Sequence, residues 1–435
     1  MPAFLRHDAP GFEAAFRALT EAKRDSDAGV DGPVAEIIAD VRQRGVDAVV
    51  ELTRRFDRWD VTDDTLRLGE DDIERAIASV PNDTRTALEL AAERIRAYHV
   101  RQLPEDAEWE DGMGIRLGWR WRPVDAAGLY VPGGLASYPS SLLMNAIPAG
   151  VAGVGRLAMC VPTPDGVLNP LVLLAARLSG IETIWRIGGA QAIAALAYGT
   201  GPIAPVDVIT GPGNAYVAAA KRQVFGHVGI DMIAGPSEVL VIADADNDPD
   251  LIAIDLLAQA EHDETAQSIC ITDNADFGAA VMTAVATRLQ RLQRQAIASA
   301  SWEAHGGVVI ARDLDHAADL ANRIAPEHLE LAVADPDALA AEIRHAGAIF
   351  LGRHTPEALG DYVAGPNHVL PTAGSARFSS GLSVLDFMKR TTLTRATPAG
   401  LAAIGPAAAR LAEAESLEAH MLSVSDRLSR PDAAE

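Results

Sequence analysis

Cysteine is scarce in this chain, which contains only Cys160 and Cys270 among its 435 residues. Each lies in a short apolar run of the kind found in strands, LAMCV for the first and SICIT for the second. We therefore expect two buried thiols in a reducing cytosol. Two cysteines also cannot form a structural zinc site without much help from histidine.

Basic residues and long apolar stretches are also few. Lysine and arginine number 37 against 60 acidic residues, which gives a formal net charge of -23. This charge argues against nucleic-acid and anionic-membrane partners, because both need clustered basic side chains. No segment approaches the roughly eighteen uncharged residues of a membrane-spanning helix, and MPAFLRHDAPGFEAAF at the N-terminus lacks the apolar core of a signal peptide. We expect a soluble, cytoplasmic protein.

Aromatic residues make up only 5% of the chain, whereas alanine is abundant and the length allows two or three domains. Residues 1–105 are charged, and Val34–Phe56 and Thr84–Tyr98 have apolar residues at helical spacing. Strand-like and helix-like segments alternate after about residue 125. The predicted strands are Leu157–Val161, Thr183–Ile187, Val206–Thr210, Val239–Ile242, Ser268–Thr272, Val308–Ile310 and Ala348–Leu351. The predicted helices between them are Asn169–Leu178, Ala190–Ala197, Ala215–Phe225, one after Asp248, and a long one through Val281–Gln295.

Such alternation predicts parallel sheets covered by helices. The predicted fold is α/β, with two Rossmann-like parallel-sheet domains, a helical N-terminal region and a helical C-terminal tail that includes Leu401–Leu428. We place the N-terminal region and linker at residues 1–120, the first α/β domain at 121–235, the second at 236–380 and the tail at 381–435.

The segment from Ile230 to Gln267 is the most informative stretch. Asp248 and Pro249 are suited to start a helix, and Gln259 and His262 lie near its expected end, three residues apart and therefore on one face. An amide oxygen and an imidazole nitrogen on one face can bind the same metal ion. By spacing alone, however, such a pair more often forms a polar edge of the core.

Three glycine-rich turns could hold a nucleotide at the carboxyl ends of parallel strands. They are YVPGG at Tyr130–Gly134, RIGGAQA at Arg186–Ala192 and VITGPGNAYVA at Val208–Ala218. None is a complete dinucleotide fingerprint, because GPGNAY has Tyr216 where the third glycine belongs. On spacing alone, a plain tight turn is the favoured interpretation of each.

A family resemblance bears on both features. The region from Ile230 to His262, with AGPSEVLVIAD and AEH, resembles the signature region of the histidinol dehydrogenases. Further matches, in the family's order, are PEH at Pro326–His328, GDY at Gly360–Tyr362, NHVLPT at Asn367–Thr372 and FSSGLSVLDFMKR at Phe378–Arg390. Together they span most of the chain beyond about residue 120.

The resemblance implies two cofactors, zinc and NAD. It assigns the zinc ligands to Gln259, His262, Asp361 and His420. It also implies that NAD is bound by half-Rossmann domains through Tyr130, Gln191 and Asn214. Without the family, Asp361 is equally a loop cap, and His420 an exposed residue on the tail.

The implied substrate is L-histidinol, which would be bound by Ser237, Glu415, His328 and the four zinc ligands. Oxidation to L-histidine removes two hydrides from one carbon and consumes one water. The resemblance makes His328 the base in both hydride transfers and Glu327 the group that activates water. His368 is a further polar candidate near the pocket. The tail, with Glu415 and His420, is implied to complete the site of a partner in a homodimer.

Three rival interpretations remain. A dehydrogenase of the same superfamily that acts on a sulfonated diol would need a cation for the sulfonate, and Glu415 would be unfavourable there. A zinc hydrolase would turn over its substrate without NAD. In a non-catalytic α/β binding protein, the glycine turns and histidines would be scaffolding.

Overall fold

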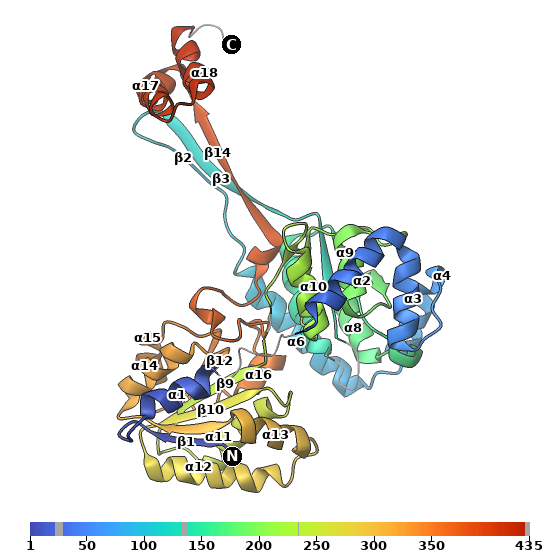
Figure 1. The fold of residues 1–435 in the computed structure, drawn as a ribbon, viewed down its shortest axis with the longest axis vertical. Coiled ribbons are helices and arrows are strands. Elements are labelled where there is room, and N and C mark those ends of the chain that lie inside the picture. Colours follow the sequence, from blue (N-terminus) through green and yellow to red (C-terminus); the bar gives the residue numbers. More distant parts are fainter. Residues whose placement is uncertain (22–28, 133–137, 234, 431–435) are drawn as a thin grey trace. The chain divides into compact units, whose positions relative to one another are not determined.

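The computed structural model describes residues 1–21, 29–132, 138–233 and 235–430 and consists of two compact units (Figure 1). Unit 1 comprises Met1–Gln102 and Asp125–Phe387, and unit 2 comprises Leu103–Val124 and Met388–Glu435. The chain therefore enters unit 2 twice, once between two parts of unit 1 and once after its end.

The first sheet of unit 1 has five parallel strands in the order β6-β5-β4-β7-β8. The strands are β4 (Ala126–Tyr130), β5 (Arg156–Cys160), β6 (Thr183–Trp185), β7 (Val208–Thr210) and β8 (Gly229–Ile230). The chain adds β5 and β6 on one side of β4 and then returns to add β7 and β8 on the other. The strand order thus reverses between β4 and β7, and ligands of open α/β sheets bind at the carboxyl ends of strands at such a point.

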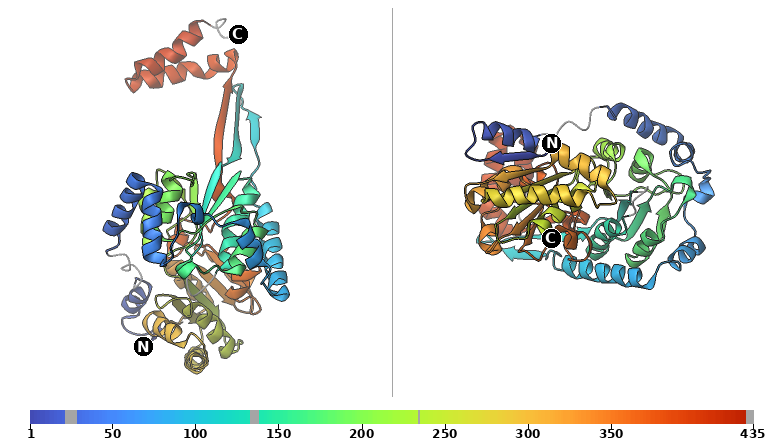
Figure 2. Two further views of the ribbon diagram at one scale, coloured as in Figure 1. Left: turned by 90° about the vertical axis from the view of Figure 1, so that its right-hand side faces the viewer. Right: turned by 90° about the horizontal axis from the view of Figure 1, so that it is seen from below.

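Helices pack against both faces of this sheet (Figure 2). One face contacts α2 (Asp31–Arg44), α3 (Val46–Asp57), α4 (Asp63–Leu66), α9 (Gly189–Tyr198) and α10 (Ala215–Val224). The other contacts α5 (Glu70–Ile77), α6 (Asn82–Val100), α7 (Pro139–Ala152) and α8 (Pro170–Leu178). Because both faces are covered, the strands are apolar throughout rather than alternating.

The second sheet of unit 1 has six parallel strands in the order β1-β11-β10-β9-β12-β13. The strands are β1 (Ala3–Arg6), β9 (Glu238–Ala243), β10 (Gln267–Thr272), β11 (Gly307–Ile310), β12 (His328–Ala332) and β13 (Ala348–Leu351). Helices α1 (Phe12–Glu21), α14 (Leu314–Ile324) and α15 (Pro336–Ala341) cover one face. Helices α11 (Pro249–Ala260), α12 (Ala275–Leu289) and α13 (Gln295–His305) cover the other. A short helix, α16 (Glu357–Tyr362), follows β13 and packs beside β12 and α11.

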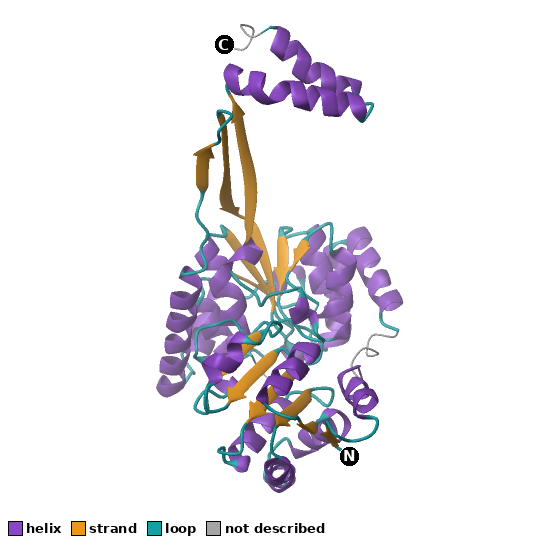
Figure 3. Ribbon diagram, turned by 90° about the vertical axis from the view of Figure 1, so that its left-hand side faces the viewer, coloured by secondary structure: helices purple, strands orange, loops and turns teal. Residues whose placement is uncertain are grey.

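Unit 2 is an antiparallel three-stranded ribbon followed by a helix pair (Figure 3). Its strands are β2 (Ala107–Glu110), β3 (Ile115–Pro123) and β14 (Met388–Ala396), and its helices are α17 (Pro398–Ala414) and α18 (Glu418–Ser429). All nine residues of β14 pair with β3, so two segments far apart in sequence form one element. The Arg390 guanidinium lies near the rings of Trp119 and Trp121, which adds cation–π contacts to the ribbon.

The structure confirms the predicted α/β class with its parallel sheets. Asp248 caps α11 as expected, since its carboxylate accepts the N–H of Asp250 at 2.9 Å. Two local predictions were wrong. The expected long helix through Val281–Gln295 is two helices, α12 ending at Leu289 and α13 starting at Gln295. The region of residues 381–435, expected to be helical, also contains strand β14, which pairs with a partner more than 250 positions earlier. The rest of the tail is helical as predicted and consists of α17 and α18, which are separated at Ser416 with its positive φ of 60°.

Within the described residues, none of the helices combines the length and the apolar character that crossing a bilayer requires.

A buried ion pair fixes the turn that follows β7. The Lys221 ammonium of α10 pairs with the Asp231 carboxylate, and both side chains are at most 4% exposed. The Lys221 ammonium also donates to the carbonyl of Gly211 at 3.0 Å. The N–H of Gly211 in turn donates to the Asp231 carboxylate at 2.9 Å. Gly211 has a φ of 120°, and a Cβ there would lie 2.0 Å from the carbonyl oxygen of Tyr130. The turn is therefore held against the end of β4, and only glycine fits at its first position.

We expect Lys221→Met to lower the free energy of unfolding by about 3–5 kcal/mol, because it leaves the Asp231 carboxylate buried without its cation. Urea titration followed by circular dichroism measures the change. Arg75→Met is the control, since Arg75 forms an exposed pair with Asp72 at 2.9 Å and its loss should cost less than about 1 kcal/mol. Equal effects of the two substitutions would contradict the importance of the buried pair.

Candidate active site

The backbone of Glu238 orients two polar side chains at the amino ends of β9 and β12. The Glu327 carboxylate accepts the Glu238 N–H at 2.8 Å, and the His328 Nδ1 lies 3.0 Å from the Glu238 carbonyl oxygen. His328 pairs in register with Val239, so the parallel ladder itself brings these groups together. Both side chains are nearly inaccessible, at 5% and 4% exposed. Glu327 and His328 are therefore held in fixed positions inside the unit.

The hydrogen bond to Glu238 also determines which nitrogen of His328 can act as a base. A carbonyl oxygen only accepts hydrogen bonds, so Nδ1 carries the proton and Nε2 carries the lone pair in the neutral ring. Nε2 is buried and has no protein partner among the described residues. Burial lowers the pKa of His328 to about 4, with the nearby Asp361 charge opposing the shift. The ring is therefore neutral near pH 7, with its basic nitrogen available.

Helix α16 brings two carboxylates to His328. Glu357 Oε1 lies 3.4 Å from Nδ1 of His328, and Asp361 is one helical turn further along α16. One potential ligand atom from each of His328, Glu357 and Asp361 lies within 4.8 Å of the others. Glu357 is fully buried, and burial together with neighbouring acids raises its pKa well above the ordinary value. Such a cluster needs a cation or shared protons to be stable.

Two of the predicted metal ligands lie on or after α11, which packs against α16 and β9. Gln259 is completely buried, and neither of its amide atoms has a protein hydrogen-bond partner among the described residues. Its neighbour in the prediction does not share the helix: α11 ends at Ala260, and His262 lies in the following turn with an exposed ring. The expectation that Gln259 and His262 share one face of a helix was therefore wrong. His262 is nevertheless close enough to lower the pKa values of His328 and His368.

His368 is a further histidine in contact with Asp361. Its Nδ1 lies 3.0 Å from the Asp361 carbonyl oxygen and its Nε2 lies 3.2 Å from the Ser141 hydroxyl of α7. The segment that carries it is also tied to α7 by the Asn367 amide, which donates to the Met144 carbonyl at 2.6 Å. His368 thus links α16 with a helix of the first sheet.

The remaining predicted substrate contacts are spread over both units. Ser237 lies half-buried in the turn directly before β9, where its carbonyl accepts the Gln267 N–H at 3.0 Å. Glu415 ends α17 and His420 lies in α18, and both are exposed residues of unit 2. The distances and hydrogen bonds described above therefore involve residues of unit 1 alone, and neither Glu415 nor His420 takes part in them.

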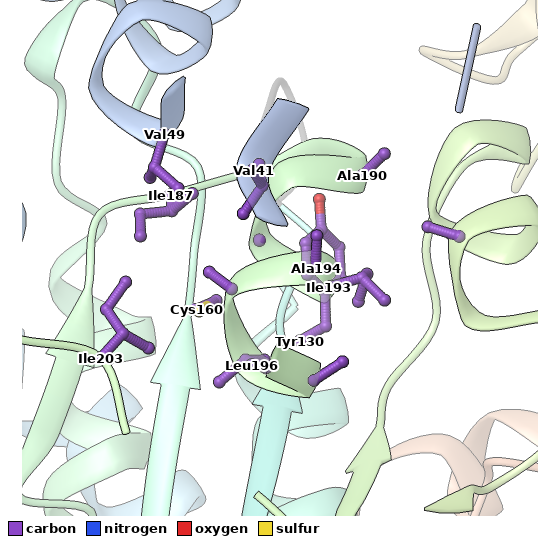
Figure 4. Close-up of a cluster of buried hydrophobic side chains, with 14 of the residues drawn as sticks. Val41, Val49, Tyr130, Cys160, Ile187, Ala190, Ile193, Ala194, Leu196 and Ile203 are labelled. Carbon is purple, nitrogen blue, oxygen red and sulfur yellow. The ribbon is translucent and has the colours of Figure 1, made fainter. Parts of the chain in front are cut away.

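A second polar centre lies at the carboxyl end of β4. The Tyr130 hydroxyl accepts the N–H of Gly189 at 3.1 Å, at the start of α9. Figure 4 shows Tyr130 alongside Ile193 and Ala194, with its oxygen directed toward the end of α9 that carries Ala190. Burial raises the pKa of Tyr130 to about 12, so the phenol is neutral.

Gln191 adds two polar atoms at the same helix start. A Cβ built on Gly189 would lie 2.8 Å from Gln191 Oε1, so the amide folds back over this glycine. Gln191 is 1% exposed, and both amide atoms lack protein partners among the described residues. An aromatic hydroxyl and an unpartnered amide at a helix N-terminus can hold a polar, anionic ligand.

Asn214 lies at the neighbouring strand end, after β7. Its side-chain oxygen accepts the N–H groups of Tyr216 and Val217 at 3.1 and 3.2 Å and so caps α10. The first of the three glycine turns, at Tyr130–Gly134, extends beyond the described residues at Gly133 and Gly134. The described parts place Tyr130, Gln191 and Asn214 at the carboxyl ends of one sheet, around the point where its strand order reverses.

Sequence reasoning missed Glu357, together with Glu330 and Asp255 beneath it. The Glu357–Asp361 spacing of four residues puts both on one face of α16 and was a usable signal. Glu330 lies in a strand that the sequence did not predict, because HLELA is short and two of its five residues are polar.

Comparison with known proteins adds independent findings. A family model described as histidinol dehydrogenase matches residues 20–428. A histidinol dehydrogenase of Ruegeria pomeroyi is 70% identical over 430 residues, which cover 99% of both chains. Its counterpart from Cereibacter sphaeroides is 68% identical over 430 residues, again with 99% of each chain covered. The crystal structure of histidinol dehydrogenase from Elizabethkingia anophelis has a TM-score of 0.94 at 36% identity, with 99% of each chain covered.

The unpartnered amide of Gln259 leads to a prediction about stability. A buried amide without hydrogen bonds costs about 1–3 kcal/mol, so Gln259→Leu should stabilise the metal-free protein by about that amount. If Gln259 is a metal ligand, the same substitution should also abolish most of any stabilisation by added Zn²⁺. Denaturant unfolding in EDTA and in excess Zn²⁺ measures both effects.

Gln267→Leu is the matched control, because the Gln267 amide donates to the Leu19 carbonyl at 2.9 Å. It should destabilise the protein in both conditions and leave the effect of Zn²⁺ intact. A Gln259→Leu protein that is less stable in EDTA yet still gains stability from Zn²⁺ would argue against a ligand role.

Proposed function

The chain belongs to the histidinol dehydrogenase family, and we propose that it oxidises L-histidinol to L-histidine through L-histidinaldehyde, with two NAD⁺ reduced in succession. Its activity as an NAD-dependent histidinol dehydrogenase follows from the close relatives named above. The proposal adds roles for individual residues. The observation that carries it is the neutral, buried His328, whose Nδ1 is held by the Glu238 carbonyl and whose buried Nε2 has no protein partner among the described residues.

His328 is the base of both oxidations. NAD⁺ accepts the hydride that leaves the carbinol carbon in each step, and the hydroxyl proton must leave with it. The free Nε2 takes this proton, while the bond from Nδ1–H to the Glu238 carbonyl holds the ring in place. The hydrogen bond to a carbonyl also stabilises the positive charge that the ring then carries.

Glu327 activates the water that is added between the two oxidations. Its carboxylate is anchored by the Glu238 N–H at 2.8 Å and lies 3.7 Å from His328 Nδ1. Carboxylate and imidazole therefore serve the same carbon from adjacent positions. Glu327 removes a proton from the water as it attacks the aldehyde, and the His328 imidazolium formed in the first oxidation returns its proton to the aldehyde oxygen. The neutral His328 then removes a hydroxyl proton of the resulting hydrate.

The proposed metal ligands are Gln259, His262, Asp361 and His420. Two imidazoles, one carboxylate and one amide oxygen suit a divalent cation such as zinc, and the unpartnered amide of Gln259 fits this role. Bound zinc would act mainly as a template for the amino and imidazole nitrogens of the substrate. Glu357 is buried close to Asp361, and a cation bound there would oppose the burial and the neighbouring acids that raise the pKa of Glu357.

NAD is proposed to bind at the carboxyl ends of the first sheet, through Tyr130, Gln191 and Asn214. The partnerless amide of Gln191 supports this placement, because a bound carboxamide or phosphate would satisfy it. Gly211 allows the turn after β7 to pack directly on the backbone of Tyr130, so the turn that carries Asn214 is held beside Tyr130.

We further propose a homodimer in which Glu415 and His420 complete the site of the partner. Both are exposed residues of unit 2, whereas the other proposed site residues belong to unit 1. Glu415 would accept a hydrogen bond from the substrate imidazole, and Ser237 would contact the same substrate.

We expect the purified protein to form two NADH per L-histidinol consumed. His328→Gln should slow both oxidations by about 10²–10⁴-fold, since it removes the base common to them. Glu327→Gln should slow only aldehyde oxidation to that extent and should leave the reduction of L-histidinaldehyde by NADH near the wild-type rate. Stopped-flow absorbance of NADH measures each half-reaction separately. Equal loss of aldehyde reduction in both variants would contradict the separate roles, and turnover without NADH would favour a hydrolase.

Sharing of the site between chains predicts rescue. Mixed dimers of Glu327→Gln and His420→Ala chains contain one site that lacks both changes. Random re-association of equal amounts should therefore restore about a quarter of wild-type activity, since half of the dimers are mixed and each has one intact site. The mixture is assayed after denaturation and refolding, with a tagged chain to verify mixing. Verified mixed dimers without activity would mean that each chain completes its own site.

A further inference from the structure

Strand β12 and helices α11 and α16 meet at the site, and each carries one proposed site residue. Each also carries a second polar residue on the same side, two positions away on the strand and four positions away on each helix. On β12, Glu330 follows His328 by two residues and faces the same side of the sheet. On α11, Asp255 precedes Gln259 by four residues, and on α16, Glu357 precedes Asp361 by four. The upper residues His328, Gln259 and Asp361 are the proposed base and ligands. The residues Glu330, Asp255 and Glu357 form a lower polar layer, in which Glu330 and Asp255 have no role in the proposed mechanism.

Glu330 is at the centre of this lower layer. Its Oε1 accepts the backbone N–H of Glu357 at 2.6 Å, and its carboxyl group is hydrogen-bonded to that of Asp255. Glu330 is 4% exposed, so these contacts replace all but a little of its hydration. A hydrogen bond between two carboxyl groups requires one of them to be protonated. In accord with this, burial raises the pKa of both groups.

The N–H that Glu330 accepts is the first one of α16. Pro356 precedes this helix and gives it no side-chain cap. The first N–H groups of a helix have no partner inside the helix and need one from elsewhere. Glu330 thus caps α16 from a neighbouring strand. Because α16 is only six residues long, fixing its first residue also fixes Asp361 in its last turn.

We propose that Glu330 is a positioning residue, which sets Asp361 and Glu357 relative to His328 by anchoring the start of α16 to the strand that bears the base. The inference rests on the proposed function for the role of Asp361 as a ligand. Strand β12 then bears the base His328 and also Glu330, which anchors the helix that supplies Asp361. Asp255 orients the Glu330 carboxyl group from α11, the helix that carries Gln259.

The test compares substitutions that keep or remove the acceptor. Glu330→Gln retains an oxygen at the same reach and can still donate to Asp255. We expect its Zn²⁺ affinity and kcat to stay within about 3-fold of wild type. Glu330→Leu fills the same space without an acceptor, and we expect its Zn²⁺ affinity to fall about 10–100-fold, the usual effect of losing a group that orients a ligand. Its kcat should fall by a similar factor, while KM for NAD⁺ stays unchanged. Zn²⁺ affinity is measured on metal-stripped full-length protein by competition with a chromogenic chelator.

Two further variants complete the design. Glu330→Asp keeps the carboxylate but withdraws it by one methylene, so it should weaken Zn²⁺ binding more than Glu330→Gln does, and it covers the case in which Glu330→Leu does not fold. Asn322→Leu is the control for stability alone. Asn322 is buried and accepts the Arg344 N–H at 2.6 Å on the other face of the sheet. It should lower thermal stability and leave Zn²⁺ affinity unchanged.

The inference is overturned if folded Glu330→Leu and Glu330→Asp proteins bind Zn²⁺ within about 3-fold of wild type. It is also overturned if Glu330→Gln loses as much affinity as Glu330→Leu, because position would then not be the cause. Failure of the proposed function looks different: the wild-type protein itself would show no specific Zn²⁺ binding or no oxidation of histidinol.

Discussion

The site depends on the parallel pairing of β9 with β12. This pairing places the backbone of Glu238 where its N–H meets Glu327 and its carbonyl meets His328. One residue that contributes no side chain to the chemistry thus aligns a carboxylate and an imidazole, and sets the protonation of the imidazole as well. A shift of this register by one residue would turn His328 to the other face of the sheet. The covering of both faces by apolar helices prevents such a shift, so packing far from the site maintains its geometry.

The burial of several acidic side chains close together is electrostatically unfavourable for the folding of this region. Glu327, Glu330 and Glu357 are all buried within the reach of His328 or of each other, in a chain that already carries a charge of -23. The elements that surround them contribute hydrogen bonds to backbone N–H groups rather than cations: Glu327 receives the Glu238 N–H and Glu330 the Glu357 N–H. Protons shared between carboxyl groups lower the remaining charge, and the metal ion of the proposed function would lower it further. The buried amides of Gln191 and Gln259 have no protein partner among the described residues, and in the proposed function each contacts a ligand.

The sequence allowed prediction of the two parallel sheets, because apolar β-branched runs such as VLVI and SICIT differ clearly from the helices between them. It also indicated the start of α11 from Asp248. It failed where tertiary contact overrides local pattern: β14 is a strand because β3 pairs with it, and β1 is a strand because β11 does. His262 was placed on a helix that ends two residues too soon. The roles of Glu330 and Asp255 could not be predicted, since a strand and two helices must first meet before the carboxyl groups contact one another. The site assignments that came from the family resemblance remain proposals.

The double entry of the chain into unit 2 has a consequence for anyone who would shorten this protein. Strand β14 covers one full edge of β3, and cutting the chain after Phe387 would remove it together with both tail helices. The remainder would keep β3 paired with β2, with the edge that β14 covered left open and the rings of Trp119 and Trp121 without Arg390. An open strand edge of this kind invites strands of other molecules to add to it. A minimal version of unit 1 therefore also requires excision of residues 103–124 and closure of the gap, because C-terminal truncation alone would leave an aggregation-prone strand edge.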